Sequence, residues 1–202
     1  MLAEAAKILQ RGGVVIYPTE TLFAIGCSVR CESAVRRVAA CKGRGEAKPF
    51  PLIIGSREQL QQAAAENGED AARLMKAFWP GGLSILLPAR SELPSGLISR
   101  EGLISLRWTS HPDAQALCCE CGSPIVATSA NISGQPAVTR SEDLEPELTS
   151  LADKVLRLPC SDHSGQPSTM VRPLGGGRLR LIREGTISAR RLLDAGFVLE
   201  RG

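Results

Sequence analysis

The segment "VVIYPTETLFAIGCSV", residues 14–29, decides the class of fold. Two apolar runs, "VVIYP" and "LFAIGCSV", enclose the polar junction Thr19-Glu20-Thr21, which predicts two strands joined by a short turn. Helical patterns flank this pair at 2–11 and 32–41. Because strands adjoin a hairpin on one side and helices on the other, the pattern argues against a purely parallel Rossmann order.

The rest of the chain continues the alternation of helices and short strands. Further helices are predicted at 57–65, 70–79, from 112 onward, at 141–152 with Pro146 as a point of division, and at 188–196. Further strands are predicted at 51–55, 83–89, 102–108, 123–129, 154–159, 168–172 and 178–183, and Gly175-Gly176-Gly177 is predicted to form a hairpin turn. Ser56 is expected to cap the helix at 57–65 with its hydroxyl. We therefore expect an α/β (α+β) fold: one mixed parallel and antiparallel twisted sheet of about seven strands, flanked by helices, in a single domain over 1–202.

Composition bounds the class of protein. The chain has 202 residues, of which 43% are hydrophobic and 22% charged, which is typical of a folded domain and excludes a disordered chain. The net charge of +3 is too small to indicate nucleic-acid binding by itself. No run of about 18 apolar residues is present, and the first helix is too short and polar for a signal peptide. These features predict a cytoplasmic protein with no membrane partner.

Common catalytic and metal-binding patterns are missing. The seven cysteines are odd in number and read as reduced thiols; Cys118, Cys119 and Cys121 lack a second ligand pair for a metal. The only histidines, His111 and His163, stand in no metal-binding spacing. No P-loop and no G-x-G-x-x-G after a strand occur, so a nucleotide site must be of another kind.

Polar residues nevertheless gather at four strand ends. They are Thr19 and Thr21 in "YPTET", Lys42 and Arg44 in "KGR", Arg107 in "SLRWTSHP", and Ser129 and Asn131 in "TSANISG". Each has a structural alternative: the threonines as turn residues, the loop cations as solvated charge, and Ser129-Ala130-Asn131 as an Asx-type turn. Arg107 stands in an apolar strand, and a structural ion pair is as well supported as binding of a ligand carboxylate.

Together these segments resemble the threonylcarbamoyl-AMP synthases of the YrdC/Sua5 family. The resemblance runs from "YPTETLFAIGC" through "KGR", "FWPGGLSILLP", "SLRWTSHP" and "TSANISGQPAVT" to "QPSTMV" and "LIREG". K-x-R followed by S-x-N is close to a signature of the active members. The resemblance implies the short, single-domain form with a YrdC/RibB-like fold and without the C-terminal domain of the longer Sua5 type.

The resemblance also implies a reaction. Family members join L-threonine, bicarbonate or carbon dioxide, and ATP into threonylcarbamoyl-AMP and release pyrophosphate, with magnesium accompanying ATP. The product passes to a threonylcarbamoyl transferase complex that modifies adenosine 37 of tRNA.

Residue roles follow from the same resemblance. Lys42, Arg44, Ser129 and Asn131 match the catalytic, nucleotide-binding K-x-R and S-x-N residues, Arg183 matches an arginine near the triphosphate, and Thr19, Thr21 and Arg107 match the threonine site. No residue is assigned to a metal. Two positions depart from the commoner pattern, because Phe50 and Gly55 stand where many members have asparagine and histidine.

Two alternatives remain. A non-catalytic, YciO-like RNA-binding paralogue would share the fold, but such relatives tend to lose the S-x-N pair that this chain keeps. Carbamoyl-adenylate chemistry, as in hydrogenase-maturation proteins, normally belongs to a much larger chain. Arginines concentrated after residue 171 would suit contact with tRNA or double-stranded RNA, or form a solvated face.

Overall fold

A computed structural model describes residues 1–42, 49–132, 134–160 and 165–201, with the side chain of Arg201 left out of account. Arg44 lies outside the described residues. The helices are α1 Leu2–Gln10, α2 Glu32–Cys41, α3 Arg57–Ala63, α4 Glu69–Phe78, α5 Pro112–Cys121, α6 Pro146–Ser150 and α7 Ala189–Asp194, with 3-10 turns Ser95–Leu97 and Ser141–Asp143. The strands are β1 Val15–Tyr17, β2 Ala24–Gly26, β3 Leu52–Ile54, β4 Leu83–Pro88, β5 Leu103–Trp108, β6 Ile125–Val126, β7 Thr128–Ser129, β8 Lys154–Val155, β9 Thr169–Gly175, β10 Arg178–Arg183 and β11 Val198–Arg201.

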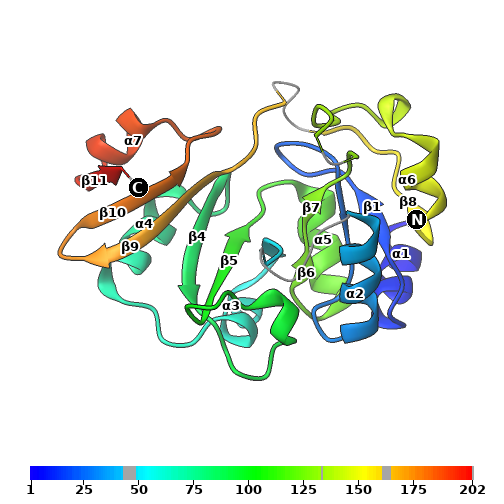
Figure 1. Cartoon of the computed structure of the whole chain (residues 1–202), viewed down its shortest axis with the longest axis horizontal. Helices are drawn as coiled ribbons and strands as arrows, with labels where there is room; N and C mark the ends of the chain where they lie inside the picture. The colour runs from blue at the N-terminus through cyan, green and yellow to red at the C-terminus, as the bar shows by residue number, and fades with distance from the viewer. Residues whose placement is uncertain (43–48, 133, 161–164, 202) are drawn as a thin grey trace.

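Among the described residues the strands form two sheets (Figure 1). The larger sheet has the order β11-β10-β9-β4-β5-β3-β6 and the smaller one β7-β2-β1-β8. Parallel pairs (β3 with β5, β4 with β9) alternate with antiparallel ones (β4 with β5, β9 with β10). The mixed sheet of about seven strands is therefore confirmed, and a second, smaller sheet is added to it.

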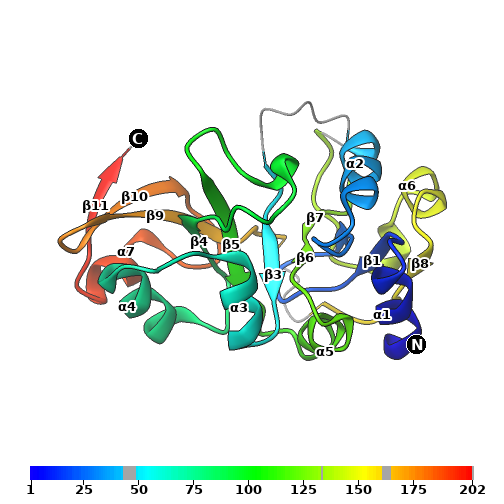
Figure 2. The ribbon, with the colours of Figure 1, turned by 90° about the horizontal axis from the view of Figure 1, so that it is seen from below.

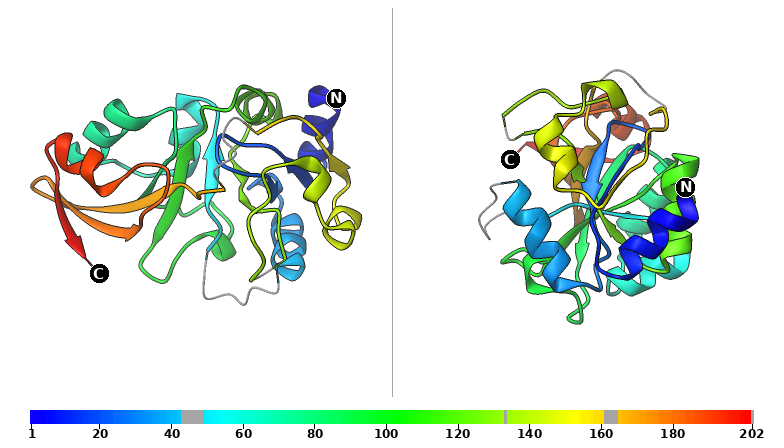
Figure 3. Two further views of the ribbon diagram at one scale, coloured as in Figure 1. Left: turned by 90° about the horizontal axis from the view of Figure 1, so that it is seen from above. Right: turned by 90° about the vertical axis from the view of Figure 1, so that its right-hand side faces the viewer.

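The two sheets are joined by the segment that the sequence presents as one strand, 123–129. Its first part pairs with the large sheet, where Ile125 lies opposite Ile53, and its second part pairs with the small sheet, where Thr128 lies opposite Ile25. At the crossing point the Ala127 amide donates to the Pro51 carbonyl at 2.8 Å. After β8 the chain returns from the small sheet to β9 in the large one (Figure 3). The crossing therefore places polar ends of both sheets close together.

Helices cover the sheets on two sides. Figure 2 shows α1, α5, α3 and α4 along one side and α2 on the opposite side. The protein has two clusters of buried apolar side chains among the described residues. The larger one includes Phe23 and Leu52, and in the second one α1 and α5 pack against Tyr17 and Ile53. All four side chains are at most 1% exposed. This packing makes the hairpin of β1 and β2 a rigid support for its turn.

Among the local expectations, the division at Pro146 is confirmed and the Ser56 cap is wrong, and one strand was not expected. Pro146 begins α6, so the helix expected over 141–152 is divided into a 3-10 turn and a short α-helix. Ser56 stands at the N-cap of α3, but its side chain makes no capping hydrogen bond, so that expectation was wrong. Strand β11 was not foreseen, because it is an edge strand whose Val198 is 61% exposed and whose sequence lacks apolar alternation. Within the described residues no helix is long and apolar enough to cross a bilayer.

Asp153 ties α2 to the start of β1. Its carboxylate accepts the Val14 amide at 2.7 Å and two Arg37 nitrogens at 3.1 and 3.3 Å. The Arg37 hydrogen bonds hold the pKa of Asp153 below its usual 3.8. A lowered folded-state pKa means that the stabilisation exists above the usual pKa and is lost as the pH falls through the folded-state value.

We therefore expect Asp153→Asn to lower the urea midpoint, and the gap between wild type and variant to narrow as the pH falls from about 5 to about 3. Urea unfolding at several pH values measures both curves. A gap that stays constant over this range would contradict the assignment. Glu66→Gln, on an exposed side chain, is the matched control.

Candidate active site

A cavity of about 170 Å³ opens where the two sheets meet. It is lined by residues from the β1–β2 turn, the large sheet, the β6–β7 crossing and the segments before β9 and after β10: Thr21, Leu22, Pro51, Ile53, Ser84, Arg107, Ala127, Thr128, Ser129, Ala137, Pro167, Ser168 and Arg183. Four of the residues predicted from sequence thus line one cavity, although they come from distant parts of the chain. They are Thr21, Arg107, Ser129 and Arg183.

The two predicted threonines have different surroundings. The Thr19 hydroxyl donates to the Leu22 carbonyl at 2.7 Å and accepts the amides of Thr21 and Leu22 at 3.2 Å. It is 1% exposed and is not among the cavity-lining residues, so it closes the turn. The Thr21 hydroxyl lies 3.0 Å from that of Thr19, and Thr21 lines the cavity. Thr19 thereby fixes the position of Thr21 on the cavity wall.

Arg107 is buried beside the cavity and has a protein partner. One of its terminal nitrogens, Nη1, donates to Glu20 Oε1, and the two side chains are only 7% and 10% exposed. The other Glu20 oxygen accepts the Thr109 hydroxyl at 2.6 Å. The sequence indicated an anionic partner for Arg107 but did not identify it, and Glu20 was passed over as a turn residue. The ion pair and a role toward a ligand are compatible, because a guanidinium has five N–H groups.

Lys42 is bound to the turn that carries the S-x-N pair. It follows the last residue of α2, is 4% exposed, and donates through Nζ to the Ser129 carbonyl at 2.9 Å. The same nitrogen contacts the Asn131 carbonyl and, at 3.2 Å, Asn131 Oδ1. Asn131 Nδ2 in turn donates to the Gln135 carbonyl at 2.5 Å. The structure therefore brings together the predicted Lys42 and Asn131 with Ser129 on the cavity wall, although Lys42 itself is not a lining residue.

Arg183 also lines the cavity. Its Nε and Nη2 donate to the Ser168 carbonyl at 3.1 and 2.9 Å, and the Ser168 hydroxyl lies 2.8 Å from that of Ser84. Ser84 and Ser168 were missed in the sequence, and the available signal was a single hydroxyl inside the apolar strand "LSILLP". Thr128 begins the segment "TSANISG" but was given no role of its own; its buried hydroxyl has no hydrogen-bond partner within the described residues. The cavity wall therefore carries more hydroxyl groups than the motifs indicated.

Two described ionisable groups next to the cavity, Tyr17 and Cys118, do not supply a base. Burial raises the pKa of Tyr17 well above 10.0, and its hydroxyl donates to the Val126 carbonyl at 2.7 Å. Burial likewise raises the pKa of the Cys118 thiol, whose sulfur lies 3.8 Å from the carbonyl of the lining residue Ile53. Both groups stay protonated near neutral pH. The chemistry available here is therefore binding and orientation by cations and hydroxyls.

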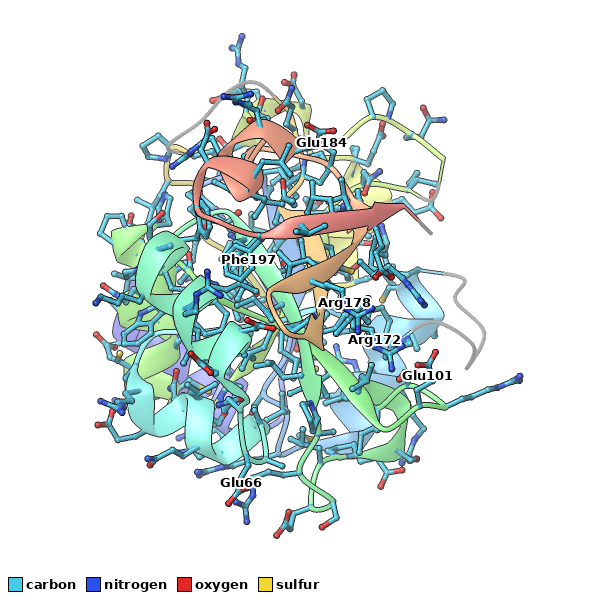
Figure 4. All side chains as sticks on the ribbon, turned by 90° about the vertical axis from the view of Figure 1, so that its left-hand side faces the viewer. Glu66, Glu101, Arg172, Arg178, Glu184 and Phe197 are labelled. Carbon is cyan, nitrogen blue, oxygen red and sulfur yellow. The ribbon has the colours of Figure 1, made fainter. Side chains whose placement is uncertain are left out.

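A larger hollow of about 620 Å³ lies at the other end of the large sheet, between α4 and the β9–β10 hairpin. None of the predicted site residues that the structure describes lines it. The Asp70 carboxylate on its wall is occupied, since it accepts the Gly177 amide at 2.9 Å and an Arg73 nitrogen at 3.3 Å. Figure 4 shows this end, where Arg172 pairs with Glu101 near Arg178. By volume alone this hollow would be the candidate active site, whereas the converging polar groups make the smaller cavity the candidate.

Known proteins resemble this chain over most of its length. The Sua5/YciO/YrdC family model, described as "Telomere recombination", matches residues 7–185. A threonylcarbamoyl-AMP synthase of Nitrosococcus oceani is 35% identical over 176 residues, which are 87% of this chain and 95% of that protein. A threonylcarbamoyl-AMP synthase of Bacillus subtilis is 36% identical over 158 residues, 75% of this chain but 45% of its own length. The chain therefore spans less than half of the Bacillus relative it matches.

Solved structures show the same architecture. The P. abyssi Sua5 structure complexed with L-threonine superposes with a TM-score of 0.91 at 28% identity, covering 98% of this chain and 58% of that one. The E. coli YciO structure superposes with a TM-score of 0.81 at 25% identity, covering 95% and 92%.

Proposed function

The chain belongs to the Sua5/YciO/YrdC family, and from this membership we propose that it is an L-threonylcarbamoyladenylate synthase. It would join L-threonine, bicarbonate and ATP into threonylcarbamoyl-AMP and release pyrophosphate and one water molecule, which makes it a nucleotidyltransferase. The relative with this name in Nitrosococcus oceani matches along nearly its whole length. The observation that carries the proposal is the convergence of Lys42, Ser129 and Asn131 beside a cavity that Arg107 also lines.

The reaction sets an electrostatic problem that these residues answer. The carbamate formed on the threonine nitrogen is an anion, and one of its oxygens must attack the α-phosphorus of ATP while the bond to the departing pyrophosphate breaks. Two unit charges at about 4 Å repel by about 4 kcal/mol at an effective dielectric of about 20. Lys42 beside the cavity and Arg183 on its wall would supply positive charge where that repulsion acts. Because the carbamate is already anionic, no protein base is required for this step, which agrees with the protonated state of Tyr17 and Cys118.

The size of the cavity indicates which substrate it receives. At about 170 Å³ it is smaller than the roughly 300 Å³ at which pockets for drug-sized ligands begin, which supports an amino acid as the ligand inside it. Arg107 would bind the threonine carboxylate. Thr21 would line the polar side of the same pocket. The nucleotide would then extend along Ser129, Asn131 and Arg183. Thr19 acts through the turn.

Several finer assignments belong to the same proposal. Magnesium fits as a counter-ion carried by the ATP phosphates, since magnesium sites use few protein ligands beside phosphate oxygens; within the described residues no group of three acidic, cysteine or histidine side chains could hold a metal. The product would pass to a threonylcarbamoyl transferase complex in the cytoplasm, where ATP and tRNA are found. Arg172 and Arg180, opposite each other on β9 and β10, would face tRNA or double-stranded RNA, because such like charges favour an anionic partner.

The test is pyrophosphate release by the purified protein with ATP, L-threonine, bicarbonate and magnesium. We expect release that depends on threonine, together with an adenylate product detectable by mass spectrometry. Equal release without threonine would contradict the substrate assignment. Tight RNA binding without any adenylate would instead support a YciO-like binding role.

A further inference from the structure

Glu20 is a buried acid that no motif assigned. It sits in the turn between β1 and β2 with a side chain that is 10% exposed, and it is not among the residues lining the cavity. Both of its carboxylate oxygens are engaged, one by Arg107 Nη1 and the other by the Thr109 hydroxyl at 2.6 Å. A buried carboxylate that uses both oxygens on neighbours of the cavity, without reaching the cavity, acts through those neighbours.

The contact fixes the orientation of Arg107. Within the described residues Nη1 is the only nitrogen of this guanidinium with a hydrogen bond. Because the guanidinium is planar and its donors are in a fixed fork, holding one nitrogen fixes the plane of the others. The remaining donors of this lining residue are left for a ligand. Glu20 also compensates a cation that would otherwise be buried without an anion, which is costly.

Glu20 itself is held from the far side. The Thr109 hydroxyl has one proton, which it donates to Glu20, and its oxygen accepts the His111 amide at 3.3 Å. His111 is 3% exposed, accepts the Ala114 amide at the start of α5 through Nδ1, and its Nε2 lies 2.9 Å from the Pro159 carbonyl. A continuous set of hydrogen bonds thus connects the packed end of α5 to the guanidinium at the cavity.

We propose that Glu20 is a positioning residue that aims Arg107 at the carboxylate of the amino-acid substrate. This inference rests on the proposed function, since it assumes that the cavity receives threonine. A pre-oriented, charge-compensated arginine binds a carboxylate without first giving up a competing arrangement. Glu20 should therefore affect recognition of the carboxylate and leave the nucleotide side of the reaction unchanged.

The experiment compares steady-state kinetics of Glu20→Gln, Thr109→Val and wild type. Glu20→Gln should raise KM for L-threonine on the order of ten- to a hundredfold, because misplacement of a binding group has effects of this size. Thr109→Val, which removes no charge, should raise it less. KM for ATP and kcat should change less than about threefold in both, since neither residue meets the nucleotide. Glu101→Gln is the matched control: it removes another glutamate paired to an arginine, but on a side chain that is 62% exposed.

L-threoninamide, which lacks the carboxylate, gives a second readout. Its inhibition constant should be the same in wild type and Glu20→Gln, whereas a general loss of folded protein would lower kcat and leave KM for threonine unaltered. An unchanged KM for threonine in Glu20→Gln, or a fall in kcat alone, overturns the proposal. If wild type itself releases no pyrophosphate in response to threonine, the proposed function fails instead, so the two failures are distinguishable.

Discussion

Lys42→Met is expected to reduce threonine-dependent pyrophosphate release on the order of a hundredfold or more, since loss of a single preorganised charge-stabilising donor has this effect in other enzymes. Lys42 is 4% exposed, and Nζ is bound to the Ser129 carbonyl and to two oxygens of Asn131. Methionine keeps the length of the side chain but provides no donor and no charge.

The same substitution should lower stability. The Ser129 and Asn131 carbonyls would lose their charged donor, and an unpaired buried acceptor costs about 1–3 kcal/mol. Activity must therefore be measured well below the unfolding midpoint, so that the loss is counted per folded molecule.

Lys42→Arg, which keeps the charge, should recover part of the stability and less of the activity, because its fork cannot reproduce three contacts from one nitrogen. Lys7→Met, at an exposed position of α1, is the matched control. A folded Lys42→Met protein with more than a tenth of wild-type activity would remove Lys42 from the proposed chemistry.

The contacts of Lys42 show where sequence reasoning reaches its limit. Helix α2 and strand β10 have the bounds that the apolar pattern predicted, because their signals are local. The partners of Lys42 lie 87 and 89 residues further along the chain, and two of the three are main-chain oxygens, which leave no trace in a sequence. The resemblance placed the lysine and the S-x-N pair in one site; only the fold gives the way they are joined. Arg44, the other cation of the motif, stays a prediction.

The same limit explains the segment 123–129. Its residues form one apolar run, and nothing in the alternation says that Ile125 pairs with one sheet and Thr128 with another. That division depends on competition between β2 and β3 for the same segment, which is a tertiary effect. It is also what brings Ser129 to the cavity. The embedded charge of Arg107 did indicate a buried anionic partner, but choosing Glu20 among the acids required the packing of the β1–β2 turn against β5.

Asn131→Asp is expected to separate stability from activity. The new carboxylate would take the place of Oδ1, which lies 3.2 Å from Lys42 Nζ, and would form an ion pair with it. This gain should offset the loss of the Nδ2 hydrogen bond to the Gln135 carbonyl, so the melting temperature should stay close to that of wild type. The negative charge would also neutralise Lys42 and repel the phosphates of ATP, and repulsion of about 4 kcal/mol between charges at about 4 Å is enough to raise KM for ATP on the order of a hundredfold.

Asn131→Ala is the informative partner of this variant, because it removes the side-chain contacts of Asn131 with Lys42 and with the Gln135 carbonyl together without adding charge. It should lose both stability and activity. Thermal unfolding and ATP-dependent kinetics should then distinguish the two variants. Asn131→Asp should keep its melting temperature and have a raised KM for ATP, whereas Asn131→Ala should lose both stability and activity. A wild-type KM for ATP in Asn131→Asp would place the nucleotide away from this turn. In that case Lys42 and Asn131 would only hold the β7 segment in place, and Arg183 would have to contact the triphosphate without them.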